Sequence, residues 1–140
     1  MSSGGVTSLV LTRMGGRPCA IPCEHVVEII PRVQLDHVPE APPEVLGVIN
    51  LRGRVVPVID MRARVSKRTN LPVYQHLVIV RAQNKQIGLA VDEVRDVVTV
   101  PDEAIEKPGD MAGVRSPGVV RIEDDLVLVL GPEDAYHAAG

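Results

Sequence analysis

The sequence predicts a mainly β protein made of two copies of a small barrel, packed against each other around a pseudo-twofold axis. Three observations lead to this fold class. The apolar residues are chiefly Val, Ile and Leu, with two Tyr and no Phe or Trp, and β-branched residues favour sheet over helix. Short apolar runs alternate with polar residues at the period of two that half-buried strands show. The chain also repeats itself, as a duplicated unit does.

The repeat consists of two sequence blocks that recur in the same order. LVLTRMGGRPCAIPCEHVVEII, from Leu9, aligns without gaps with LVIVRAQNKQIGLAVDEVRDVV, from Leu77. GVINLRGRVVPVID, from Gly47, aligns with GVVRIEDDLVLVLG, from Gly118. Such a short unit with several strands favours closure into a barrel, because closure removes exposed strand edges.

Each copy is expected to run from a strand pair through a short polar and apolar stretch and a proline-rich connection to a closing hairpin. The domain boundaries that we predict are one domain over 1–140, a first barrel over 7–62, a connector over 63–73 and a second barrel over 74–132. Residues 24–30 and 92–98 are the best candidates for helical turns. The first of these, EHVVEII, could equally be a strand, since it is short and β-branched.

The segment from Val45 to Arg62, VLGVINLRGRVVPVIDMR, predicts the closing hairpin of the first copy. Gly53 can take the positive φ that a two-residue turn demands, so the strand after Arg54 should fold back antiparallel. Pro57 has no amide hydrogen, which places it at an edge, at a bulge or facing outward. The hairpin therefore carries two cations, Arg52 and Arg54, at its tip.

Composition excludes several classes of protein. The net charge is −3, and with almost no aromatic residues for base stacking this argues against a nucleic-acid surface. No apolar run approaches the roughly 20 residues of a membrane span. The N-terminal MSSGGVTS lacks the features of a signal peptide. We therefore expect a soluble, cytoplasmic protein.

No residue pattern predicts catalysis, a cofactor or a metal site. Cys19 and Cys23 have no second cysteine pair, and cytosolic thiols stay reduced, so we interpret them as structural. Phosphate-binding, nucleophile and zinc motifs are absent from the sequence. The carboxylates Asp92, Glu93 and Asp96 are interpreted as a solvated face.

The chain resembles the CheW-like adaptors of bacterial chemotaxis. GVINLRGRVVPVIDMR, preceded by HVVEI and followed by LVIVRAQNKQIGLAVDEVRDVV, carries the resemblance, which covers about residues 7–132. It implies two five-stranded SH3-like β-barrels and no catalytic activity. It also implies a cytoplasmic scaffold that couples the tips of methyl-accepting chemoreceptors to the regulatory domain of a CheA-type histidine kinase, associated with receptor arrays at the inner membrane.

The resemblance further implies a receptor-binding groove between the barrels. The positions that match it are Val26, Glu28, Ile29, Gly47, Arg52, Gly88 and Val97. An apolar trough with a few orienting charges suits an amphipathic helix, and the two glycines would let the partner backbone approach closely. Arg52 and Glu28 could bind the receptor, or they could be an internal pair that orients two elements.

The two hairpin tips differ in charge. Glu123, Asp124 and Asp125 occupy the places of Arg52, Gly53 and Arg54. The acidic tip is a possible contact with the kinase. Head-to-tail pairing of a basic tip with an acidic tip would then form rings. The alternative is that these charges are exposed and unpaired. The turn and motif positions that mark the first hairpin are Asn50, Gly53, Arg54, Pro57 and Asp60.

The sequence is also compatible with other functions. An SH3-like or KOW-type module that binds another partner would need a basic, aromatic face if that partner were a nucleic acid. A relative of the kinase and a small enzyme with an unrecognised site are the remaining alternatives. The absence of Phe and Trp departs from the family pattern and leaves less packed area per residue.

Overall fold

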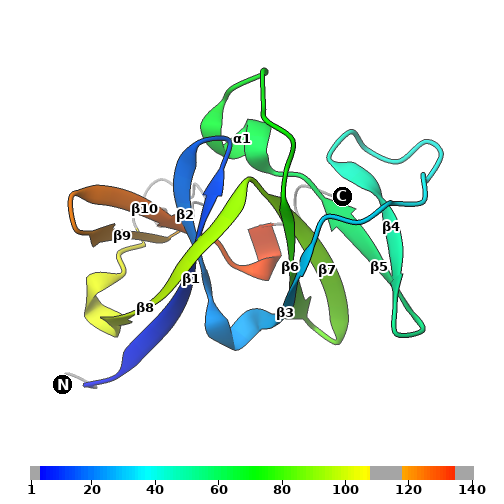
Figure 1. Cartoon of the computed structure of the whole chain (residues 1–140). Helices are drawn as coiled ribbons and strands as arrows, with labels where there is room; N and C mark the ends of the chain where they lie inside the picture. Colours follow the sequence, from blue (N-terminus) through cyan, green and yellow to red (C-terminus); the bar gives the residue numbers. More distant parts are fainter. Residues whose placement is uncertain (1–3, 108–117, 135–140) are drawn as a thin grey trace.

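The computed structural model describes residues 4–107 and 118–134, and within them two five-stranded sheets stand side by side (Figure 1). The first sheet has the order β8-β1-β2-β10-β9. Its strands are β1 (Val6–Met14), β2 (Arg17–Pro22), β8 (Glu93–Pro101), β9 (Gly118–Ile122) and β10 (Asp125–Val129). The second sheet has the order β3-β6-β7-β5-β4. Its strands are β3 (Val26–Pro31), β4 (Val45–Leu51), β5 (Arg54–Ile59), β6 (His76–Ala82) and β7 (Lys85–Val91).

The predicted pseudo-symmetry is present in the strand order. Exchanging each of β1 to β5 with the strand five places later, so that β1 and β6 change places and so on, converts the order of the second sheet into that of the first. Equivalent pairs also share their register: Leu9 lies opposite Pro22 in β1 and β2, as Leu77 lies opposite Ala90 in β6 and β7. The mainly β fold with two small barrels is therefore confirmed.

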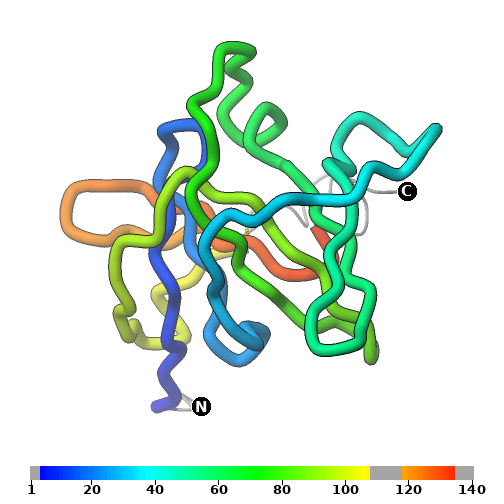
Figure 2. Tube along the Cα trace, turned by 45° about the vertical axis from the view of Figure 1, so that its right-hand side comes forward, coloured from blue at the N-terminus to red at the C-terminus, as the bar shows by residue number. Residues whose placement is uncertain are grey.

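The predicted boundaries of the two barrels are wrong, because the repeat copies exchange strands. β1 and β2 of the first copy join β8, β9 and β10 of the second, and β6 and β7 of the second copy join β3, β4 and β5. Neither 7–62 nor 74–132 contains one whole sheet. The parallel contacts of β2 with β10 and of β5 with β7 close this exchange, so each barrel depends on both copies (Figure 2).

The predicted helical turns are strands over most of their length. A 3₁₀ turn at Cys23–His25 precedes β3, and the whole of 93–101 belongs to β8. β-branched residues lose little side-chain freedom in an extended strand. The connector region holds a short α-helix, α1 (Arg62–Ser66). No helix there has the length and apolar character needed to cross a membrane.

Each sheet closes towards a barrel through a bridge to its outer strand. The Asp36 amide donates to the Val48 carbonyl, and the Val48 amide donates back to Asp36, both at 2.9 Å. Glu106 and Val119 make the equivalent pair of hydrogen bonds in the other sheet. The bridges cover part of the outer edges of β4 and β9, which would otherwise leave backbone groups unpaired.

Three apolar clusters hold the described residues together, and Val, Ile and Leu dominate them in the absence of Phe and Trp. One cluster lies in each barrel, around Val56 and Leu77 in the second sheet and around Leu9 and Val120 in the first. The largest contains residues of both sheets, among them Ile21 and Leu89. The two sheets therefore share a continuous core.

Candidate functional site

The β4–β5 hairpin turns where the sequence predicts it. Leu51 pairs with Arg54, which leaves Arg52 and Gly53 as the two turn residues. Their φ angles are 53° and 82°, the positive values that a two-residue hairpin of this type requires at both positions. The Asn50 side-chain oxygen accepts a hydrogen bond from the Gly53 amide at 2.9 Å. Asn50 and Gly53 therefore build the turn that projects Arg52 from the sheet.

Arg52 reaches back to Glu28 on β3, at the opposite edge of the same sheet. Its Nη1 donates to Oε1 of Glu28 at 2.7 Å and also contacts Oε2. The Arg52 side chain is 74% exposed, whereas Glu28 is 20% exposed. The hydrogen bond from Arg52 holds the pKa of Glu28 below its ordinary value, so this carboxylate stays charged. The internal pair exists, and most of the guanidinium still faces solvent.

Exposed apolar side chains lie on two edge strands, β3 of the second sheet and β8 of the first. Each of these strands begins where the chain passes from one sheet to the other. Val27 and Ile29 on β3 are 39% and 38% exposed. Val97 on β8 is 56% exposed and occupies the place in the first sheet that Ile29 occupies in the second. Val26, by contrast, packs against the shared core. Ile29 and Val97 are therefore available to a partner.

The two glycines of the predicted groove are buried. A Cβ on Gly47 would lie 2.5 Å from the Asp36 carbonyl oxygen. A Cβ on Gly88 would meet Ile79 Cδ1 at 3.3 Å. The close approach that these glycines permit is made by other parts of this chain.

Pro57 lies inside β5, which pairs with strands on both sides. It faces Val48 of β4, and the parallel pairing with β7 begins only at Val58. Pro57 therefore lies just outside the short β5–β7 pairing, where its missing amide hydrogen costs none of the described pairs with β7. β5 is not an edge strand, so that alternative for Pro57 is wrong. Arg54 is exposed at the start of the same strand.

The acidic tip of the β9–β10 hairpin forms a similar two-residue turn. Ile122 pairs with Asp125, and Glu123 has a φ of 55°. Glu123, Asp124 and Asp125 are exposed, as predicted for this tip. The tip differs from its basic counterpart because no salt bridge joins any of the three carboxylates to another described residue.

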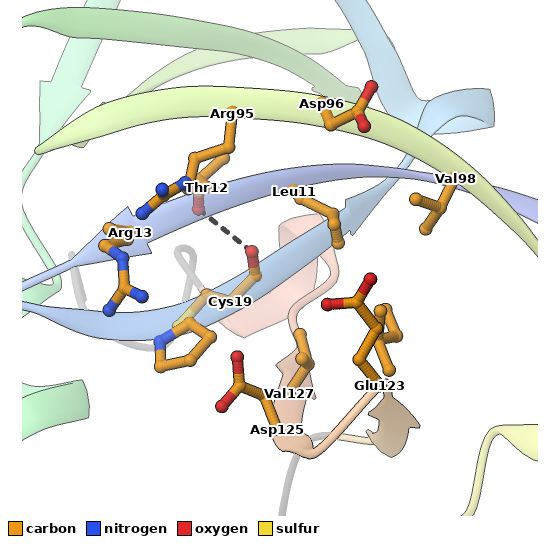
Figure 3. A pocket seen from close by; sticks show the side chains of 12 residues that line it. Leu11, Thr12, Arg13, Cys19, Arg95, Asp96, Val98, Glu123, Asp125 and Val127 are labelled. Atoms are coloured by element: carbon orange, nitrogen blue, oxygen red, sulfur yellow. Dashed lines mark hydrogen bonds between the residues drawn. The ribbon is translucent and has the colours of Figure 1, made fainter.

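A pocket of about 350 Å³ opens beside this tip, within the first sheet (Figure 3). Apolar side chains such as Leu11, Val98 and Val127 line it, and its charged lining comes from the residues Arg13, Arg95, Asp96, Glu123 and Asp125. Both arginines lie within 4.0 Å of Glu93, at 4.0 and 3.2 Å. The pocket therefore combines an apolar wall with carboxylates that remain available.

The sequence interpretation missed a buried charged cluster around Arg62. Asp92 was expected on a solvated face, but its side chain is only 12% exposed and its Oδ1 accepts a hydrogen bond from Arg62 at 2.8 Å. Asp60 accepts from the same guanidinium. The arginine lies 30 positions before Asp92 in the chain, so no local pattern indicates the pairing.

The cysteines are free thiols, with Cys19 buried and Cys23 partly exposed. Burial raises the pKa of Cys19 to about 12, which makes it a poor nucleophile. Among the described residues no group of three or more His, Cys, Asp or Glu side chains could hold a metal ion.

Comparison with known proteins identifies the family of this chain. The family model described as "CheW-like domain" matches residues 8–139. Chemotaxis protein CheW of Rhizobium meliloti (strain 1021) is 35% identical, over 97% of this chain and 90% of that protein. Chemotaxis protein CheW of Bacillus subtilis (strain 168) is 36% identical, over 82% of this chain and 73% of that protein.

A solved structure agrees with the sequence relatives. The crystal structure of scaffolding protein TtCheW from Thermoanaerobacter tengcongensis superposes with a TM-score of 0.76 and 25% identity, over 89% of this chain and 84% of that one. The sequence comparison and the structure comparison thus agree, because both match this chain to CheW proteins. This chain belongs to the CheW-like domain family.

Proposed function

We propose that this chain is a non-catalytic scaffold that couples chemoreceptor tips to a CheA-type histidine kinase. The observation that carries the proposal is the Arg52–Glu28 pair, which holds a largely exposed guanidinium beside the β3 strand and its exposed Ile29. The scaffold acts in the cytoplasm, and its link to the inner membrane runs through the receptors. Its membership of the CheW-like family supports this role.

The receptor-binding surface consists of Glu28, Ile29, Arg52 and Val97. An amphipathic helix presents an apolar stripe flanked by charges, so it needs exposed apolar side chains and a fixed charge on the protein. Ile29 and Val97 supply the first. Arg52 supplies the second, because Glu28 and the tight turn fix its position while most of its surface stays open to a second carboxylate. Both interpretations of the pair then hold together.

The test uses a matched pair of variants at one hairpin tip. Arg52→Ala and Arg54→Ala each remove one exposed arginine from the same turn, but only Arg52 contacts Glu28. We expect Arg52→Ala to reduce co-sedimentation with a purified receptor cytoplasmic fragment at least fivefold and Arg54→Ala to reduce it less than twofold, since one lost charged contact has effects of about this size. Melting curves should coincide. Equal binding by wild type and Arg52→Ala would reject this surface.

The kinase contact is proposed at the acidic tip and its pocket. A regulatory domain with a basic, apolar projection fits there, because Glu123 and Asp125 line the pocket beside apolar side chains and Asp124 is exposed at the same tip. Charge complementarity of this kind acts mainly on the association rate and weakens with salt. The β4–β5 tip has less free charge than its sequence indicates, since Arg52 is already paired.

Asp124→Lys tests this contact, with Glu103→Lys as its control. Both positions are exposed carboxylates, and only the first lies at the hairpin tip. Binding to a purified kinase regulatory domain should decrease with rising salt for wild type and Glu103→Lys, and Asp124→Lys should weaken binding and flatten this dependence. Salt-independent binding by wild type would contradict the proposal.

A further inference from the structure

The charged cluster missed by the sequence interpretation is centred on Arg62, whose residue surface is 5% exposed. Nε and Nη2 donate to the two oxygens of Asp60 at 3.0 and 3.1 Å. Nη1 donates to Oδ1 of Asp92 at 2.8 Å and to the Pro72 carbonyl at 2.6 Å. The Tyr74 ring lies 5.9 Å from the guanidinium carbon. We call Asp60, Arg62 and Asp92 the Arg62 clamp.

The clamp joins the two sheets, and Asp92 alone makes the crossing. Asp60 follows β5 and Arg62 begins α1, so their pairing is local to the second sheet. Asp92 lies between β7 of the second sheet and β8 of the first. Its Oδ2 accepts from the Gly16 amide at 2.7 Å, in the β1–β2 turn of the first sheet. Its own amide donates to the Arg13 carbonyl at 2.7 Å.

The connector between the repeat copies is fastened to the same turn. Arg68 donates from Nη1 to the Gly15 carbonyl at 3.1 Å. Ser66 donates from its hydroxyl to the Arg62 carbonyl at 2.8 Å and lies against Gly15. In Figure 1, α1 stands at the top, above the β1–β2 turn and away from the β4–β5 tip. The helix that begins at Arg62 is therefore remote from the hairpin tip that carries Arg52.

A directional contact is needed at this place because the core that the two sheets share is apolar. The shared core of Ile, Val, Leu and Met attracts without fixing an angle. Hydrogen bonds between charged groups have strict geometry, and the planar guanidinium binds a carboxylate through two parallel bonds. Burying such a group gains little net stability, so its best-supported use is to specify one arrangement among several.

We propose that the Arg62 clamp is a positioning device that sets the angle between the two barrels, with Asp92 as its crossing residue. The clamp fixes the start of β8, which carries Val97, relative to the end of β5, whose hairpin carries Arg52. It therefore sets the spacing of the two sides of the receptor surface. This inference rests on the proposed function for its effect on receptor binding and on the structure alone for its effect on the barrels.

The experiment compares Asp92→Ala with Asp60→Ala in the full chain. Each variant removes one carboxylate from the same buried guanidinium, but only Asp92→Ala cuts the link to Gly16. Spin labels are attached to cysteines introduced by Lys85→Cys on β7 and Arg121→Cys on β9, both at exposed positions. Because β7 belongs to the second sheet and β9 to the first, the labels report the distance between the sheets. Cys23→Ser removes the accessible native thiol. Receptor binding is measured on the same proteins without labels.

We expect Asp92→Ala to broaden the inter-label distance distribution and weaken receptor binding about tenfold, within the usual range of coupling between sites. Asp60→Ala should leave the distribution unchanged and binding within about twofold of wild type, because it keeps the crossing contact. Asp92→Asn, which keeps the side-chain shape, replaces Asp92→Ala if the latter does not fold.

The possible outcomes separate the two proposals. Equal effects of the Asp60 and Asp92 variants on distance and binding would show that the cluster only stabilises the fold and would overturn the inference. An unchanged distance distribution in the Asp92 variant would overturn it as well. If wild type itself binds no receptor, the proposed function fails, while the label distances still decide whether the clamp sets the angle between the barrels.

Discussion

Substituting Gly47 by Ala should destabilise the fold far more than the same change at Gly118, although the two glycines are equivalent in the repeat. At Gly47 the new Cβ would lie 2.5 Å from the Asp36 carbonyl oxygen and 3.0 Å from Leu35 Cβ. The backbone there has a φ of 154°, which side chains rarely adopt. At Gly118 the nearest atom is the Ile105 Cγ2 methyl at 3.1 Å, and φ is not in the positive range.

The size of the difference follows from what must move. Relief of the Gly47 clash pushes the 35–36 backbone away from β4 and breaks the two hydrogen bonds between Asp36 and Val48. Two such bonds contribute about 1 kcal/mol each. Backbone strain adds roughly 1 to 3 kcal/mol. We therefore expect Gly47→Ala to lower the free energy of unfolding by about 3 to 5 kcal/mol. Gly118→Ala should stay within about 1 kcal/mol of wild type, because a methyl group can yield.

Urea unfolding monitored by far-ultraviolet circular dichroism measures both values, with equal m-values as the check that the unfolded states are alike. Equal losses at the two positions, or a loss below about 1 kcal/mol at Gly47, would refute the steric explanation. Any weakened receptor binding of Gly47→Ala would then have to be assigned to a direct contact, as the family resemblance implied.

Three further outcomes follow from buried groups. Arg62→Ala should lower the free energy of unfolding by about 3 to 5 kcal/mol in urea titrations, since it leaves two carboxylates unpaired; a loss like that of an exposed arginine would contradict the burial seen here. A thiol reagent should modify Cys23 in the native protein and Cys19 only on unfolding, because burial raises the pKa of Cys19 to about 12; equal native rates would count against this. Burial raises the pKa of Asp92, but the hydrogen bonds from Arg62 and Gly16 outweigh this and keep the pKa below its ordinary value. The contribution of Asp92 to stability is therefore present above its unfolded-state pKa and is lost as pH falls through its folded-state pKa. Wild type should lose more stability than Asp92→Asn on acidification below about pH 4. Parallel profiles of stability against pH for the two proteins would contradict this prediction.

The strands and the closing hairpin could be predicted from the sequence because their signals are local. The alternation of Ile49 and Leu51 and the Arg52-Gly53 turn are signals that span only a few residues. The repeat can be recognised from the sequence alone. The repeat also identifies equivalent residues, and the equivalence holds in the register of both sheets.

The exchange of strands between copies could not be predicted in the same way. A repeat shows that β3 corresponds to β8, but it does not tell whether β3 pairs with β1 of its own copy or with β6 of the other. Either pairing buries similar apolar residues. The choice depends on how the ends of β2 and β7 lead into the next strands, which is a property of the whole chain.

The candidate site was predicted in part for a related reason. Arg52 and Glu28 lie together as one alternative required, and Ile29 and Val97 are exposed. Gly47 and Gly88 are buried, because their lack of a side chain serves the packing of this chain. Contacts with residues outside their own strands bury these glycines, such as Asp36 against Gly47.

The most direct test of the adaptor role is a three-component sedimentation experiment. Receptor-containing membranes, a CheA-type kinase and this chain are mixed, and the kinase in the pellet is measured with wild type, Arg52→Ala or no added chain. We predict that wild type brings the kinase to the membranes and that Arg52→Ala does so several-fold less well. Kinase recovery that does not depend on the chain would contradict the role proposed for it.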